Sequence, residues 1–98
     1  MNISANSLGF GSKNLYIFNN IEKVNEARRT FEQRAINGMN MEIIPTEREN
    51  ELLVIDNDDA DCFRRNIYDN PQNNKKTAEL YYNTLVSIYR NSAEKHYL

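Results

Sequence analysis

Apolar residues recur along the chain with two different periods, and each change of period predicts a new element. The run Asn14–Phe18, NLYIF, is rich in strand-forming residues and predicts a short strand. From about residue 20 to 37 the spacing becomes three and four, which predicts an amphipathic helix with one buried stripe. The members of this stripe are Ile21, Val24, Ala27, Phe31 and Ala35. Asn19 followed by Glu22 is typical of a helix capping box, and Gly38 is typical of a helix C-terminus.

Two further apolar runs, MEIIP and LLVID, are separated by the polar segment TEREN and predict a β-hairpin. Pro45 belongs at a strand end because it has no N–H to donate to the sheet. After Asp56 the helical period returns with Ala60, Phe63 and Ile67. We expect Asp58 to be the N-cap of this second helix, since its carboxylate can accept from the first free N–H groups.

A long helix, roughly residues 74–95, follows. One apolar row along it predicts the core-facing side: Ala78, Tyr81, Leu85 and Ile88. A second row consists of Tyr82, Val86 and Tyr89. Either the helix is buried on a wide side, or the second row is a seam for a partner or a second copy, which Tyr suits because its ring is large and its tip polar.

The resulting order, β-α-β-β-α-α, predicts a small α+β domain whose three-stranded sheet has its helices packed on one face. The other face of the sheet would then remain open to a partner. Residues 1–12 are small and polar without a period, so we expect a flexible N-terminal arm before a single domain at 13–98.

The charge is distributed unevenly along the chain. The chain has 14 acids and 12 bases, a net charge of −2. Between Glu42 and Asp61 lie eight acids and one base (−7), so the remaining six acids and eleven bases give +5. Such a concentration on the hairpin and the following helix start predicts a negative surface that would attract a basic protein.

The acidic stretch also permits a catalytic hypothesis. An apolar strand ending in Asp56, Asp58 and Asp59 before a helix resembles, over about fifteen residues, the opening of a phospho-acceptor receiver domain. That resemblance would imply Mg²⁺ held by these acids. However, only 37 residues follow Asp61, too few for the remaining strand–helix units of that fold, so no receiver residue is assigned.

Other catalytic or nucleic-acid chemistry has little support. His96 is the single histidine and is expected to fray near the chain end, and Cys62 is expected to be a small buried residue. No cysteine and histidine cluster suggests zinc. We predict no cofactor and no metal. Nucleic-acid binding would depend on four arginines, Arg28, Arg29, Arg64 and Arg65, which form no continuous basic stripe.

The sequence therefore predicts a non-enzymatic protein-binding module, such as an inhibitor, an adaptor, or a secretion- or virulence-associated accessory protein. The expected partner is a protein with a basic surface, with a homodimer as an alternative and no membrane. The partner-binding residues that we expect are Glu47, Glu49, Glu51, Asp58, Asp59, Tyr82 and Tyr89. One cysteine and no leader-like apolar run favour the cytoplasm, or secretion by a route without a signal peptide. The sixteen Asn indicate an A/T-rich gene, typical of a bacterium or phage.

Overall fold

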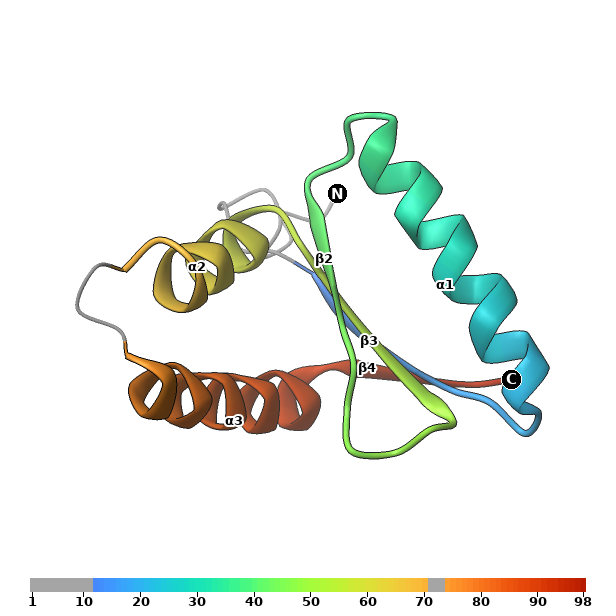
Figure 1. The fold of residues 1–98 in the computed structure, drawn as a ribbon. Coiled ribbons are helices and arrows are strands. Elements are labelled where there is room, and N and C mark those ends of the chain that lie inside the picture. The colour runs from blue at the N-terminus through green and yellow to red at the C-terminus, as the bar shows by residue number, and fades with distance from the viewer. Residues whose placement is uncertain (1–11, 71–73) are drawn as a thin grey trace, which may run out of the picture.

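A computed structural model describes residues 12–70 and 74–98 of the chain, so the predicted arm lies almost wholly outside the described residues. The elements follow the order β1 (Lys13–Ile17), α1 (Ile21–Ile36), β2 (Met41–Ile44), β3 (Glu51–Asp56), α2 (Asp58–Ile67), α3 (Lys75–Ser92) and β4 (Glu94–Tyr97). The predicted α+β class, the first helix and the hairpin of β2 and β3 are confirmed (Figure 1).

The sheet has four strands in the order β2-β3-β1-β4, so the prediction of three strands is wrong. β3 pairs antiparallel with both β1 and β2, and β4 pairs parallel with β1. The additional strand, β4, occupies residues that the helical prediction for 74–95 had partly absorbed; α3 ends at Ser92 and Ala93 is already extended. Pairing with the free edge of β1 decides the conformation there.

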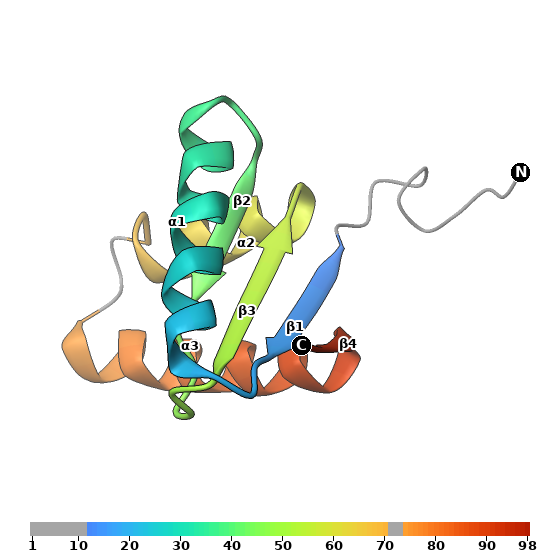
Figure 2. The same cartoon turned by 90° about the vertical axis from the view of Figure 1, so that its right-hand side faces the viewer.

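Helices cover both faces of the sheet, and the prediction of helices on one face only is therefore also wrong. α1 lies on one face, whereas α2 and α3 lie on the other (Figures 1 and 2). The side chains of β3 alternate between them, since Leu52 and Val54 join the cluster under α1 while Leu53 and Ile55 join the cluster under α2 and α3. A strand buried on both faces explains the uninterrupted apolar run LLVI.

The ends of the first helix are set by local hydrogen bonds. Asn20, rather than the expected Asn19, is the N-cap of α1, and its side chain accepts from the Glu22 N–H at 2.9 Å. At the other end Gly38 has a φ of 98°, in the region that favours glycine. Its N–H donates to the Ala35 carbonyl and that of Met39 to Arg34, the pattern of a Schellman motif.

The second helix begins differently. Asn57 is its N-cap in place of the predicted Asp58, which is instead the first helical residue. The Asn57 backbone adopts φ 55° and ψ −127°, and its side chain makes no capping hydrogen bond. The acids Asp58, Asp59 and Asp61 in the first turn still meet the positive end of the helix dipole, which offsets part of the missing cap.

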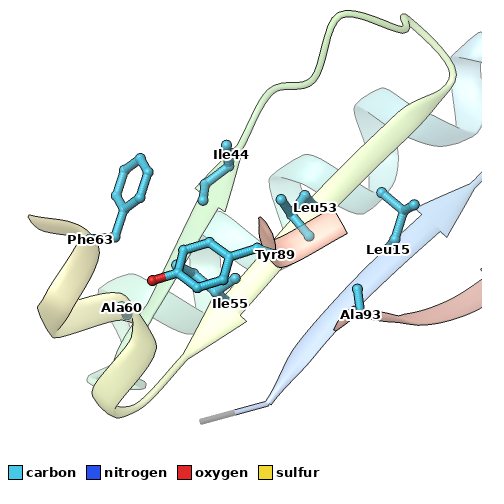
Figure 3. Packing of buried hydrophobic residues seen from close by; sticks show 8 residues of the cluster. All are labelled: Leu15, Ile44, Leu53, Ile55, Ala60, Phe63, Tyr89 and Ala93. Carbon is cyan, nitrogen blue, oxygen red and sulfur yellow. The ribbon is translucent and has the colours of Figure 1, made fainter. Parts of the chain in front are cut away.

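The two rows of α3 are buried differently from the prediction, because the second row lies in the core while Leu85 of the first row also packs against it. Tyr89 is buried among Leu53, Ile55 and Phe63, with Tyr82 and Val86 packed against that cluster (Figure 3). Tyr81 and Ile88, expected in the core, are 40% and 52% exposed. Since the rows lie only about 100° apart around the helix, the placement of α2 beside α3 decides which of them is buried.

Candidate functional site

A groove runs between the β2–β3 hairpin and α3, with a volume of about 620 Å³. Its lining combines an apolar floor with polar walls: Pro45, Thr46, Glu47, Tyr82, Asn83, Val86, Ser87 and Arg90. The fold thus brings together Glu47 and Tyr82, two of the predicted partner-binding residues from distant segments. A hollow of this size and composition lies within the range of sites that accept a small ligand or a partner's side chains.

Tyr82 holds the two walls of the groove together. Its hydroxyl donates to the Pro45 carbonyl at 2.7 Å, which ties α3 to the end of β2. Its ring meets Phe63 edge-on, with centroids 6.0 Å apart. Burial raises the pKa of Tyr82, and the nearby Tyr68 adds to the effect, so the hydroxyl stays protonated as a donor. The floor of the groove is therefore attached to the core.

Glu51 belongs to the support of the hairpin, which corrects the prediction that it lies on an exposed acidic tip. It is only 3% exposed. Both carboxylate oxygens lie near Nη2 of Arg90, at 3.0 and 3.1 Å, and Oε1 also accepts from the Thr46 hydroxyl at 3.1 Å. Arg48 lies 3.5 Å from the same carboxylate. This buried acid fixes Arg90 at the end of the groove.

Tyr89 is the second predicted site residue that the structure places in the core, at 5% exposure. Burial raises its pKa to about 12, with smaller contributions from Cys62 and Asp59. Its ring has no surface to offer a partner. The exposed apolar side chains of α3 are instead Leu80, Tyr81 and Ile88, which the periodicity alone did not identify as exposed.

The remaining predicted acids do not form one patch. Glu47 and Glu49 are exposed at the hairpin tip, whereas Asp58 and Asp59 lie past the far end of β3, about 17 Å away at 3.3 Å per residue. Asp58 is exposed, and Asp59 lies 3.1 Å from the Lys13 ammonium group. Of these predicted acids, Glu47 lines the groove, and Glu49 is exposed at the same hairpin tip.

The acids of the metal hypothesis contact groups of the chain itself. Asp56 accepts a hydrogen bond from the Ser12 N–H, and Asp59 pairs with Lys13. Within residues 12–70 and 74–98, no three His, Cys, Asp or Glu side chains are grouped so that they could hold a metal ion. His96, expected to fray, stacks on Tyr16 at 4.8 Å and lies 2.9 Å from Oδ1 of Asn14.

The arginines considered for nucleic-acid binding lie in two separate places. Arg28 and Arg29 border a shallow hollow on the outer side of α1, together with Glu22 and Glu26. Arg64 reaches from α2 to the Met41 carbonyl and lies 3.7 Å from Glu42. Arg65 is exposed beside Asp61 and Asp69. Acids are thus interleaved with the bases at both places.

The chain matches no protein-family model, and neither the curated proteins nor the solved structures contain a significant match to it. Across the described ranges, none of the helices has the length and apolar character that crossing a membrane requires. The site itself is therefore the basis for a functional proposal.

Proposed function

We propose that this protein is a small non-enzymatic module that binds another protein through the groove between the β2–β3 hairpin and α3. The observation that supports the proposal is the composition of this groove. Tyr82 and Val86 form a partly apolar floor that packs against the core. Polar side chains such as those of Asn83 and Ser87 line the walls. Such a centre with a polar rim is the usual anatomy of a protein interface.

The electrostatics of the rim indicate the chemistry of the partner. Arg90 is already paired with Glu51, so its charge is largely neutralised within the protein. Glu47 and Glu49 are exposed at the hairpin tip, and among the residues that the structure describes no cation lies within ion-pair distance of either. The groove therefore favours a segment with an apolar side chain for the floor and a Lys or Arg beside Glu47.

The proposal is tested by obstructing the groove from α3. We expect Asn83→Arg to abolish partner binding, because the longer cationic side chain fills the groove and repels a basic segment. Asn91→Arg is the matched control, since Asn91 is an exposed asparagine on the same helix that does not line the groove. Partners would be captured from extracts of the source cells and identified by mass spectrometry.

A partner retained by the Asn91 variant and lost by the Asn83 variant supports the proposal. Equal retention by both variants contradicts it, as does the absence of any protein that binds the unmodified chain above background. Circular dichroism of both variants shows whether the fold is kept. Glu47→Gln should weaken the capture and reduce its dependence on salt, because a rim charge acts mainly through long-range attraction.

A further inference from the structure

The two edges of the sheet are treated differently by the rest of the chain. At the β2 edge, Arg64 of α2 donates to the Met41 carbonyl and to the Asn40 side chain, and it lies beside Glu42. A cationic side chain thus covers backbone groups that would otherwise be free to pair with another strand. The start of this edge is thus covered by the protein itself.

At the β4 edge, residues 12–70 and 74–98 provide no such cover. The Leu98 N–H donates to the Ile17 carbonyl at 2.8 Å, and the Leu98 carbonyl accepts from the Asn19 N–H at 2.9 Å. Backbone groups alternate in direction along a strand, so those of His96 also point to β1 while those of Lys95 and Tyr97 point away from the sheet. In the described part of the chain, no group bonds to Lys95 or Tyr97 on that outer side.

The side chains of β4 are exposed as well as its backbone. Tyr97 is 75% exposed and Leu98 is 51% exposed, and both Glu94 and Lys95 are exposed. β4 is the edge strand of the sheet, beside β1 (Figure 2). An unpaired edge that carries an exposed aromatic ring is suited to pairing with a further strand.

We infer that the occupant of this edge is the β4 strand of a second copy, paired antiparallel about a two-fold axis at His96. In this register the outward backbone groups of Lys95 face those of Tyr97 in the other copy, which satisfies both. Each Lys95 side chain then lies opposite a Tyr97 ring on the same face of the sheet, a favourable cation–π pair. The two sheets join into one continuous sheet.

The alternative registers are less favourable. Shifting the strands by two residues in one direction, which keeps the outward groups facing each other, would place Lys95 directly opposite Lys95 of the other copy, and like charges in that position repel. Shifting them in the other direction would place Tyr97 opposite Tyr97 and leave the outward groups of Lys95 without an opposing residue of β4. On the other face of the chosen register, Glu94 lies diagonal to His96 of the second copy, so no acid directly opposes an acid. The four-residue length of β4 implies a small interface and hence a weak, concentration-dependent dimer.

Sedimentation equilibrium of the full chain over a range of concentrations tests this inference. We expect a monomer–dimer equilibrium that Lys95→Glu weakens about tenfold or more, since the cation opposite Tyr97 is lost. Lys76→Glu changes the net charge equally at an exposed position on α3, and it should leave the equilibrium unchanged. A monomer at every concentration overturns the inference, as does a dimer that Lys95→Glu does not weaken.

Disulfide trapping tests the register. In a Cys62→Ala background, His96→Cys should give a cross-linked dimer on oxidation, because the two-fold axis brings the two residues opposite each other within disulfide range. Glu94→Cys should not cross-link, since the two copies of residue 94 lie about four residue lengths, ~13 Å, apart. Cross-linking of residue 94 in preference to 96 overturns the proposed pairing.

The test separates this dimer from binding in the groove. Asn83→Arg obstructs the groove and leaves the β4 edge untouched, so the dimer should persist in that variant. Loss of self-association on Asn83→Arg together with its persistence in Lys95→Glu would show that the copies associate through the groove, and would overturn the β4 pairing.

Discussion

The two faces of the sheet are sealed by different means. On the face under α2 and α3, two helices cover the strands, and Leu53, Ile55, Ala60 and Phe63 are at most 1% exposed (Figure 3). On the face under α1, a single helix covers the same strands, and its cluster ranges from Leu52 at 0% to Phe31 at 9% exposure, so its phenylalanine is less deeply buried than Phe63. One helix is narrower than the sheet, so part of that face is left for side chains to close.

Aromatic side chains close the remaining part of the α1 face. The Tyr16 ring lies 5.2 Å from the ring of Phe31 and 4.8 Å from that of His96. The Arg34 guanidinium lies 5.2 Å from the Phe31 centroid, a cation–π contact that also shields the ring from water. Two helices thus exclude water from their face by close packing. The face under the single helix is closed at its border by partly exposed aromatic rings.

The largest expected effect is on the free energy of unfolding, which two phenylalanine-to-alanine substitutions, one on each face of the sheet, should lower by different amounts. Phe63→Ala should lower the free energy of unfolding by about 3–5 kcal/mol, because it leaves a cavity in a fully buried cluster. Phe31→Ala should cost less, about 2–3 kcal/mol, because water and neighbouring side chains can fill part of the space. Urea denaturation measures both.

Leu80→Ala is the control, since Leu80 is 65% exposed and its truncation should change the free energy by no more than about 0.5 kcal/mol. Equal losses for the two phenylalanines would mean that the faces are equally well packed. A larger loss for Phe31 would reverse the comparison.

A second difference concerns the tyrosine of each face at alkaline pH. Burial raises the pKa of Tyr89 to about 12, and it raises that of Tyr16 as well, although Arg34 opposes the shift of Tyr16. An unfolded tyrosine ionises near 10, so the stabilisation from a buried neutral Tyr89 is complete below pH 10 and is lost as the pH rises towards 12. Two pKa units correspond to about 3 kcal/mol.

We therefore expect Tyr89→Phe to flatten the fall in the free energy of unfolding between pH 10 and 12, and Tyr16→Phe to flatten it less. Denaturation of both variants and the unmodified chain at several pH values measures the effect. A Tyr89→Phe profile parallel to that of the unmodified chain would show that Tyr89 ionises normally in the folded protein.

The smallest expected effect concerns the start of the helix on each face. Asn57 precedes α2 with a positive φ of 55° and no side-chain cap, so Asn57→Gly should raise the free energy of unfolding by about 0.5–1 kcal/mol by relieving backbone strain. Asn20 caps α1 through its side chain, so Asn20→Ala should lower it by about 1 kcal/mol. Thermal denaturation shows whether each substitution raises or lowers the stability. If Asn57→Gly is destabilising, no backbone strain is stored at Asn57.

The local elements were largely predictable from side-chain periods. The spacing of Val24 and Phe31 predicted α1 to within a residue at each end, and Gly38 marked its C-terminus. The hairpin and α2 followed from the apolar runs and from Ala60 and Phe63. The run LLVI also indicates that helices cover both faces, because four consecutive apolar residues are typical of a strand buried on both sides.

The candidate site was predictable only in part. Glu47 and Tyr82 were predicted to bind a partner, and both line the groove. No local sequence pattern indicated that they lie in the same site. Glu51 has the same residue type and the same two-residue spacing as Glu47 and Glu49, yet Arg90, 39 residues further on, lies above it and buries it. The pairing of distant residues left no trace in the local sequence.

The sequence by itself determined α1, the hairpin of β2 and β3, and the approximate position of α2, because capping, turn chemistry and apolar period act between residues a few positions apart. Only the tertiary structure decided that EKHY forms β4, since this segment lacks strand periodicity and depends on pairing with β1, about 80 residues earlier. The same holds for the burial of Tyr89 instead of Tyr81. Two adjacent rows of equal apolarity present the same local pattern, and the neighbouring α2 and β3 select the one that is buried.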